Sequence, residues 1–415
     1  MTPELQCLAD ALNNKVATPN AGVTHATTAN GETPSADFLR ELHQSSSALQ
    51  ASGMLVTRTT TPREVPKEAP CSNLDNPAYT DHFVKARWNL ENGWGDPQIV
   101  PYVTGGLLRT MSPLIQNAVN HCDGMKAYRG DDGKLRLFRS EYTCNRFRDF
   151  VKRKCLPDVE PSELLKLIKK LLALDAPKWL SKEPRGVLYL KTILSASAVT
   201  TTQDGPNEAI LCIFCLWSLP HDPGRALPYK TADGKASAKK RHLPNNDGEA
   251  YSHKKILWLL GTDARISGTQ GTNFFVLWVS RYGKLELITT PLEEWPDISG
   301  LGRDSVLELA RKRLTKGPVI ESRPNGSQGF VEPVVVTEKN FTIKDIIIAD
   351  DENRLRGAFA VGSDCRITPV SAVRHGNREI SFPLNLFPFV SLLQTWVRDI
   401  IYGKEENEWA SVVDG

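Results

Sequence analysis

The sequence contains no apolar run close to the roughly 18 residues that a membrane-spanning helix needs, so no membrane partner is expected. It also lacks an excess of charge: 51 lysines and arginines against 48 aspartates and glutamates give a net charge of +3, which does not indicate a nucleic-acid partner. The eight cysteines are scattered, so we expect no disulfide scaffold and a reducing compartment. The eight histidines show no metal-ligand spacing, so no metal site is predicted.

One pair of cysteines, Cys212 and Cys215, lies close together in the sequence. The residues around the pair, 209–217, are apolar and β-prone, which predicts a buried strand. A structural zinc site needs a second pair of ligands at similar spacing, and the sequence has none. We therefore interpret the pair as part of a core.

The first 75 residues are rich in serine, threonine, alanine, asparagine and proline and have little hydrophobic periodicity. This composition predicts a disordered N-terminal arm, most clearly at 13–36 and 57–70. A mitochondrial targeting peptide is rich in arginine and poor in acids, whereas the first arginine here is Arg40 and Glu4 and Asp10 come early. We therefore expect a cytoplasmic location.

The rest of the chain alternates between strand and helix signals. Residues 124–128 and 135–138 flank an Asp-Asp-Gly turn, which predicts a β-hairpin. Apolar residues at helical spacing predict an amphipathic helix that begins at Pro161, continues to Leu174 and is ended by Pro177. Further strands are predicted at 187–194, 209–217, 256–260, 274–279, 285–289, 358–361 and 366–370, and further helices at 304–313 and 388–401.

At 415 residues the chain is long for a single core, so it predicts two domains. The stretch 218–225, Ser-Leu-Pro-His-Asp-Pro-Gly-Arg, has the composition of a linker. The predicted parts are a disordered arm at 1–75, a small α+β domain at 76–217, the linker at 218–225 and a large α+β domain at 226–415. Strand-rich halves that each carry a few helices indicate an α+β fold.

Nine short segments follow one another in an order and at spacings typical of one enzyme family. In the first half they are Trp94-Gly-x-Pro97…Val100-Pro101-Tyr102, Gly124-Met-Lys-Ala-Tyr128, Arg136-Leu-Phe-Arg139 and Asn145-Arg-Phe…Cys155-Leu-Pro157. In the second half they are Ile256-Leu-Trp-Leu-Leu-Gly261, Gly271-Thr-Asn-Phe-Phe275, Ile298-x-Gly-x-x-Arg303-Asp-Ser, Cys365…Pro369-Val-Ser371 and Asp399-Ile-x-Tyr402-Gly. With them, residues 76–413 resemble the branched-chain aminotransferases, which are fold-type IV enzymes that use pyridoxal phosphate (PLP).

The resemblance implies a two-domain α+β fold of fold-type IV, a homodimer, and a PLP pocket between the domains. In this family a lysine holds PLP as a Schiff base, a glutamate bonds the pyridine nitrogen, and a tyrosine bonds the ring hydroxyl. An arginine, threonine side chains and backbone amides hold the phosphate.

Three PLP-binding positions are retained in this comparison. The pattern Arg225-Ala-x-Pro228-x-x-Thr231-x-Asp233-x-Lys235 matches the approach to the family's lysine and places Lys235 on it. Lys230 is the alternative, but choosing it loses the match at Arg225, Pro228 and Asp233. Arg146 falls on the phosphate-binding arginine, and Ser363 stands where a phosphate-binding threonine is expected.

Other PLP-binding positions are altered. Lys240 replaces the tyrosine that bonds the ring hydroxyl, and Gly268 replaces the glutamate that bonds the pyridine nitrogen. Gly271 and Gly302 stand where the family has threonines.

The substrate side also differs from the family. The family's His-Tyr-Gly reads Gln116-Asn117-Ala118, its Phe-Glu-Gly reads Cys122-Asp123-Gly124, and its Tyr-x-Arg reads Tyr189-x-Lys191, so Tyr189 is the retained residue. We expect acid–base or electrostatic groups from Lys235, Asp233, His121, Asp123, Lys191 and Asp364. The predicted substrate pocket consists of Tyr189, Lys191, Asn117, His121, Asp123, Asp233, Lys240, Gly268 and Asp364.

The replaced glutamate bears directly on function. PLP stabilises a carbanion by drawing electrons into its pyridine ring, and a buried carboxylate keeps the ring protonated. Glycine at 268 cannot do so, and the loss of one preorganised partner costs about 10²–10³ in rate. We therefore expect weak PLP binding and little transamination, in a repurposed biosynthetic enzyme that acts on a largely apolar small molecule. Two alternatives stay open: a genuine PLP-dependent transaminase of branched-chain or hydrophobic amino acids with 2-oxoglutarate, and a non-catalytic binding protein.

Two charged runs have simpler interpretations than binding sites. The run Lys235–His242 has no interleaved aromatic residues, so a charged loop at the pocket rim is favoured over a nucleic-acid patch. Asp350-Asp351-Glu352 lacks the spacing of a calcium-binding loop, which favours a solvated turn.

Overall fold

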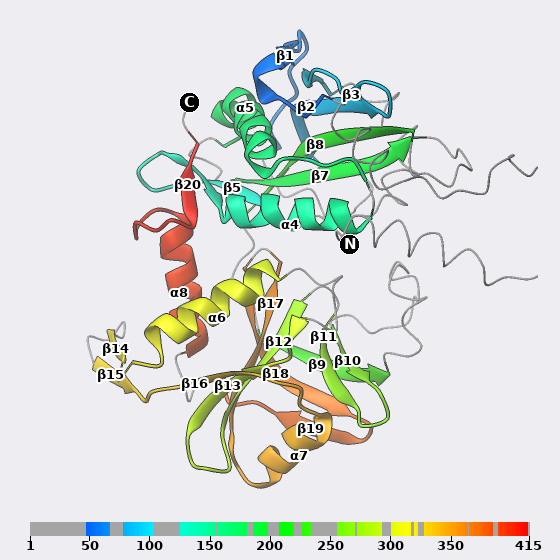
Figure 1. Cartoon of the computed structure of the whole chain (residues 1–415). Coiled ribbons are helices and arrows are strands. Elements are labelled where there is room, and N and C mark those ends of the chain that lie inside the picture. Colours follow the sequence, from blue (N-terminus) through cyan, green and yellow to red (C-terminus); the bar gives the residue numbers. More distant parts are fainter. Residues whose placement is uncertain are drawn as a thin grey trace, which may run out of the picture. The chain divides into compact units, whose positions relative to one another are not determined.

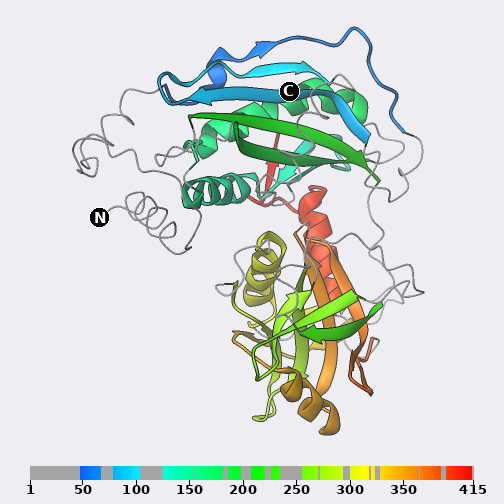
Figure 2. The same ribbon diagram turned by 90° about the vertical axis from the view of Figure 1, so that its right-hand side faces the viewer.

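The computed structural model describes residues 47–66, 78–102, 125–154, 156–180, 186–197, 207–219, 226–233, 255–269, 272–292, 300–316, 319–322, 328–363, 365–384 and 389–413. The chain divides into two compact units, Met1–Leu219 with Glu408–Gly415, and Pro220–Asn407 (Figures 1 and 2). Each unit contains a large sheet with helices packed on it, which confirms the expected α+β class. Within the described ranges, no helix is both long and apolar enough to cross a membrane.

The described part of the first unit is built on one sheet with the strand order β1-β4-β2-β8-β7-β5-β6-β20, with β3 beside β2. Its strands are β1 (Leu55–Val56), β2 (Ala78–Asn89), β3 (Gly93–Trp94), β4 (Gln98–Pro101), β5 (Lys126–Arg129), β6 (Leu135–Phe138), β7 (Val187–Ser197), β8 (Glu208–Ser218) and β20 (Ala410–Val412). The pairing of β5 with β6 confirms the predicted hairpin. The last strand corrects the assignment of all residues after 226 to the second domain, because β20 pairs with β6.

Helices α4 (Ser140–Arg153) and α5 (Pro161–Trp179) pack on one face of this sheet. Pro161 occupies the first turn of α5, as predicted, but Pro177 does not end the helix. Pro177 lies in the last turn, where it removes one N–H···O=C hydrogen bond, but the buried Trp179 anchors the helix beyond it. The Trp179 indole donates a hydrogen bond of 3.0 Å to Asp81, and the amide of Leu180 still bonds to the carbonyl of Ala176.

Strand β8 carries residues of two separate cores, because successive side chains point to opposite faces. Cys215 packs in the core beneath α4 and α5, whereas Cys212 belongs to a second core on the other face, together with Phe83, Tyr102 and Phe214. Both cysteines are buried, which confirms the predicted buried strand.

Part of the N-terminal arm is ordered. The short helix η1 (Ala51–Gly53) contacts α5, the Leu49 and Ala51 side chains are buried in the core, and β1 pairs in parallel with β4. The expectation of disorder is therefore wrong for residues 47–66. The composition hid this because two small apolar side chains and backbone hydrogen bonds, rather than a periodic apolar stripe, hold the segment.

The described part of the second unit is a six-stranded barrel in the order β11-β10-β9-β18-β17-β12, closed by a β11–β12 pair (Figure 1). Its strands are β9 (Leu227–Asp233), β10 (Lys255–Leu260), β11 (Arg265–Thr269), β12 (Thr272–Val279), β17 (Leu355–Gly362) and β18 (Ile367–His375). Strands β13 (Leu285–Thr289), β16 (Val335–Glu338) and β19 (Arg378–Ser381) extend the sheet, and β14 (Val319–Ser322) pairs with β15 (Gln328–Val331).

Three helices accompany the barrel: α6 (Leu301–Arg313), α7 (Ile343–Asp351) and α8 (Phe389–Ile401). Helix α6 begins three residues before the predicted start at 304. The sequence analysis missed α7, which begins with a capping box between Thr342 and Asp345. Asp350 and Asp351 end α7 and form ion pairs with Arg378. The segment expected to be a solvated turn is therefore the end of a helix, where both carboxylates are paired with an arginine.

Candidate active site

Strand β9 leads to the predicted PLP-binding lysine and lies between β10 and β18 of the barrel. In backbone register, Ala232 of β9 pairs with Trp258 of β10, which pairs with Gly268 of β11. The structure therefore places Gly268 about 10 Å, two strand spacings, from the chain that approaches Lys235. Asp233 pairs with Leu259 through its backbone. Six predicted site residues lie outside the described ranges: Lys235, Lys240, Asn117, His121, Asp123 and Asp364.

Gly268 occupies a β-bulge. The register passes from Trp258 opposite Gly268 to Leu259 opposite Ile266, which leaves Ser267 as the extra residue. The Ser267 hydroxyl donates to the Trp258 carbonyl at 3.0 Å, and Gly268 has a φ of +133°, where a side chain causes strain. The local backbone therefore favours glycine at position 268. The Ser-Gly pair inside a strand was the signal in the sequence.

The start of α6 lies against the end of β17. A Cβ added to Gly302 would lie 2.0 Å from the Gly362 carbonyl oxygen and 2.9 Å from Cγ1 of Val361, so no other residue fits without movement. Ser363 follows Gly362 directly, and Gly362 accepts a hydrogen bond from the Cys365 amide at 3.0 Å. The structure thus brings the predicted phosphate-binding Ser363 next to the first turn of α6.

This juxtaposition suits a phosphate group. The first N–H groups of a helix have no partner within the helix and carry a partial positive charge, so they bind anions. The N-cap residue of α6 is Gly300, which has no side chain to cap the first turn. Amide donors, the absence of a side chain at Gly302 and the neighbouring Ser363 together fit the phosphate end of PLP. The family resemblance implies a carboxylate at position 268 for the ring end, and Gly268 has none.

Arg303 anchors the start of α6 through its side chain, and its guanidinium contacts groups outside the helix. Its buried guanidinium donates to the Thr290 carbonyl at 2.9 and 3.2 Å and also contacts Glu338. Burial opposes the ionisation of Glu338, but hydrogen bonds from Arg311 and Arg303 outweigh burial and lower its pKa. Arg303 therefore fixes the start of α6 and is not available to an anion.

Arg146 lies on α4 in the first unit. Its Nη1 is 3.3 Å from the hydroxyl of Tyr142, one helical turn earlier, and its Cζ lies 5.8 Å from the centre of that ring. The side chain is half-buried. Its role as the phosphate-binding arginine remains implied by the family resemblance.

Tyr189 and Lys191 project from one face of β7, opposite the helices. In register, Tyr189 pairs with Leu216 and then Tyr79, while Lys191 pairs with Phe214 and then Phe83. Neighbours in register point to the same face of a sheet, so the two predicted pocket residues share a surface with several aromatic rings.

We call Tyr79, Phe83, Tyr102 and Phe214 the aromatic face. Tyr79 stacks on Tyr102 with centroids 4.7 Å apart, and Phe83 stacks on Phe214 at 5.1 Å. Burial raises the pKa of both tyrosines, so their hydroxyls stay protonated at neutral pH. Phe83, Tyr102 and Phe214 are buried in the second core, whereas Tyr79 is half-buried, so Tyr79 is the ring of this set that retains exposed surface. Neither Tyr79 nor Tyr102 was predicted as a site residue from the sequence, although Tyr102 ends the motif Val100-Pro101-Tyr102.

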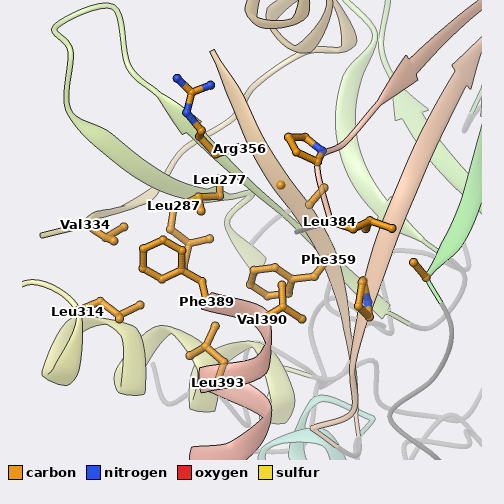
Figure 3. A pocket seen from close by; sticks show the side chains of 15 residues that line it. Leu277, Leu287, Leu314, Val334, Arg356, Phe359, Leu384, Phe389, Val390 and Leu393 are labelled. Atoms are coloured by element: carbon orange, nitrogen blue, oxygen red, sulfur yellow. The ribbon is translucent and has the colours of Figure 1, made fainter. Parts of the chain in front are cut away.

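A separate cavity of about 110 Å³ lies in the second unit, between the sheet and α8 (Figure 3). Its lining includes Leu277, Leu287, Phe359 and Phe389, and Arg356 is the only charged residue among the described residues that line it. The Arg356 guanidinium donates to backbone carbonyls and points away from the apolar side chains (Figure 3). The cavity offers no acid–base group and contains no predicted site residue. Within the described ranges, no three His, Cys, Asp or Glu side chains gather as a metal site would require.

Comparison with known proteins links this arrangement to one family. The branched-chain-amino-acid aminotransferase of Dictyostelium discoideum is 28% identical over 397 residues, which is 91% of this chain and 99% of that protein. The cytosolic branched-chain-amino-acid aminotransferase of Saccharomyces cerevisiae is 30% identical over 382 residues, which is 86% of this chain and 96% of that protein. No family model matches the chain.

Solved structures agree on the fold. The crystal structure of the branched-chain amino acid aminotransferase from Thermobaculum terrenum in its PLP form has a TM-score of 0.55 at 16% identity, covering 82% of this chain and 100% of that chain. With a 30% identical relative matched over nearly its whole length, the chain belongs to the branched-chain aminotransferase family.

Proposed function

We propose that this chain is an enzyme that retains the phosphate-binding half of a PLP site but lacks its ring-activating half. It acts on a largely apolar small molecule, with little or no transamination. The observation that carries the proposal is Gly268, a glycine with positive φ in a bulge, at the position where the family has a glutamate.

The phosphate end is served by the chain's own groups. The first amides of α6 and the Ser363 hydroxyl would hold the phosphate, and the family resemblance assigns Arg146 to the same role and Lys235 to the covalent attachment. The close approach of Gly302 to Gly362 supports this assignment, because it keeps the helix start free of side-chain atoms.

The ring end is where the chain departs from an efficient transaminase. When bound, PLP supplies an electron sink that depends on a protonated ring nitrogen. A buried carboxylate would hold that proton, and glycine cannot. The loss of such a partner costs about 10²–10³ in rate, and Lys240 in place of the ring-hydroxyl tyrosine adds to the loss.

The remaining groups bind the substrate and move protons. Tyr189 and Lys191 contribute a ring and a cation from β7, beside the aromatic face. Asn117, His121, Asp123, Asp233 and Asp364 complete the proposed pocket, with Lys235 as the proton acceptor at the reacting carbon. We also propose that the protein is a homodimer, as the family resemblance suggests, and that it is cytoplasmic, like its cytosolic relative from Saccharomyces cerevisiae.

A genuine transaminase is the second candidate, and the fit of the α6 start and Ser363 to a phosphate favours it. The two candidates separate in one experiment. The purified protein is titrated with PLP by absorbance, reduced with borohydride, and mapped by peptide mass analysis. It is then assayed with L-leucine and 2-oxoglutarate for glutamate.

We expect weak PLP binding, modification at Lys235 and at most trace glutamate, and a Lys235→Ala variant should lose the modification. A protein that is saturated with PLP as purified and turns over at the ~1–10³ s⁻¹ usual for enzymes would overturn the first candidate in favour of the second. A protein that binds no PLP, and shows no turnover of the amino acids and 2-oxo acids tested, would instead indicate a binding protein.

A further inference from the structure

Residues 57–66, which we call the strap, cross the first unit beside the aromatic face. The Thr57 amide bonds to the Ile99 carbonyl at 2.9 Å, and the Thr59 amide donates to Nε2 of His82 at 2.9 Å. The opposite nitrogen of His82, Nδ1, lies 2.6 Å from the buried carboxylate of Asp175, on α5. The strap is thus tied to the sheet by specific polar contacts, while Val65 packs against the core.

Arg63 is the strap residue that reaches the aromatic face. Its Nη1 donates to the Tyr79 carbonyl at 3.3 Å and its Nη2 to the Tyr102 carbonyl at 2.7 Å. Its Cζ lies 4.1 Å from the centre of the Tyr102 ring. One planar guanidinium therefore contacts the backbone of both members of the stacked pair and the ring of one of them.

The backbone of Asp81 and its side chain complete this connection. The Arg63 amide donates to Oδ1 of Asp81 at 2.7 Å, while Oδ2 accepts from Lys178 at 2.7 Å. The Tyr102 amide donates to the Asp81 carbonyl at 2.8 Å. Arg63, Asp81 and Tyr102 thus form a closed set of hydrogen bonds.

This set surrounds an irregularity in β2. The register between β2 and β8 jumps from Tyr79 opposite Leu216 to Phe83 opposite Phe214, so three residues of β2 oppose one of β8. Bulges of this kind re-aim side chains and are common beside active sites. The Tyr79 carbonyl at the bulge finds its donor in Arg63.

We propose that Arg63 is a positioning residue: through the strap it fixes the Tyr79–Tyr102 stack and so sets the shape of the subsite for the substrate's apolar side chain. The inference rests on the proposed function, in which the half-buried Tyr79, aligned in register with Tyr189, contacts the substrate while the buried Tyr102 supports it from behind. Arginine suits this role better than lysine, because its planar fork can donate to two carbonyls and stack on a ring at once.

The test measures how strongly binding depends on the side chain of the ligand. Dissociation constants of the full-length protein are measured by calorimetry for pyruvate and for 4-methyl-2-oxopentanoate, which differ in their apolar side chains. Their ratio reports the subsite alone. We compare the wild-type protein with Arg63→Ala, Arg63→Lys and the matched control Arg58→Ala, which removes an exposed arginine from the same strap.

We expect Arg63→Ala to reduce the wild-type ratio by about tenfold, within the range typical of a change in one apolar contact, while the Kd for pyruvate stays unchanged. Arg63→Lys should restore at most part of the ratio, and Arg58→Ala should match wild type. Arg63→Lys keeps the charge and most of the aliphatic stem. If Arg63→Ala fails to fold, the ratio measured for Arg63→Lys tests the role of Arg63 instead.

Two results would overturn the inference in distinguishable ways. A wild-type protein without any preference for the branched 2-oxo acid would refute the proposed substrate class, and the inference with it. A wild-type preference that a folded Arg63→Ala, or Arg63→Lys, retains in full would refute the role of Arg63 alone.

Discussion

Gly302 and Gly362 are so close that any side chain at 302 would overlap the Gly362 carbonyl oxygen. A Gly302→Ala change must therefore displace the start of α6 from β17, and overpacking of this kind costs about 1–3 kcal/mol. Because the same displacement moves the helix amides away from Ser363, we expect PLP binding to weaken roughly tenfold. Thermal melts and an absorbance titration measure the two effects. Gly357→Ala in the same strand is the control, since its Cβ would meet only a carbonyl at 3.7 Å, and an equal loss there would contradict the explanation.

Gly268→Glu should not restore efficient transamination. The φ of +133° strains any side chain, so the variant is expected to lose roughly 1–3 kcal/mol of stability and to place its carboxylate imprecisely. Gly268→Ala carries the same strain without the charge, and the comparison of the two separates backbone from carboxylate. The measurements are urea unfolding and glutamate formation from L-leucine and 2-oxoglutarate. Family-level rates from Gly268→Glu alone would show that the backbone relaxes and that the missing carboxylate was the sole defect.

The Asp81 carboxylate should make the free energy of unfolding depend on pH in the acidic range. Burial opposes its ionisation, but hydrogen bonds from Lys178, the Arg63 amide and Trp179 outweigh burial and lower its pKa. A carboxylate with a lowered folded pKa contributes stability that is fully present above its unfolded pKa of about 3.9 and is lost as the pH falls through the folded value. In urea unfolding, wild type should exceed Asp81→Asn by a constant margin above about pH 5, and the margin should shrink below pH 4. A margin that grows on acidification would contradict the assignment.

Removal of residues 47–66, which include the strap, should destabilise the first unit. A chain that begins at Ser47 keeps every described contact of residues 47–66, whereas one that begins at Lys67 loses the burial of Leu49 and Ala51 and the hydrogen bonds of Thr59 and Arg63. The second chain should be less stable than the first by several kcal/mol, the sum expected for such contacts. Thermal melts of the two truncated proteins measure the difference. Equal melting temperatures would show that residues 47–66 do not contribute measurably to the stability of the first unit.

The regular elements were predictable because each carries a local pattern. The apolar stripe after Pro161 predicted α5, and the continuous apolar run 209–217 predicted β8. Pro177 was misread because the buried Trp179, a tertiary contact, holds the last turn in helical form. The order of the strap was not predicted for the same reason. Its attachment depends on contacts with Asp81 and His82 rather than on its own composition.

The site residues also fall into two groups: those that a local sequence motif locates and those that only a tertiary contact explains. Ser363 and Gly268 could be located by matching the family's motifs, which are local in sequence. The reason for glycine at 302 could not, because it depends on a carbonyl 60 residues away in the chain. The stacking of Tyr79 on Tyr102 likewise depends on a bulge, and bulges leave little trace in a hydrophobic pattern.

The pairing of β20 with β6 has a consequence for how the protein is made. Leu135–Phe138 leaves the ribosome about 270 residues before its partner Ala410–Val412. At synthesis rates of about 5–20 residues per second, this edge waits roughly 15–55 s with its backbone groups exposed. Unpaired edges promote aggregation, so the nascent first unit is vulnerable to aggregation until Ala410–Val412 has been synthesised and pairs with β6.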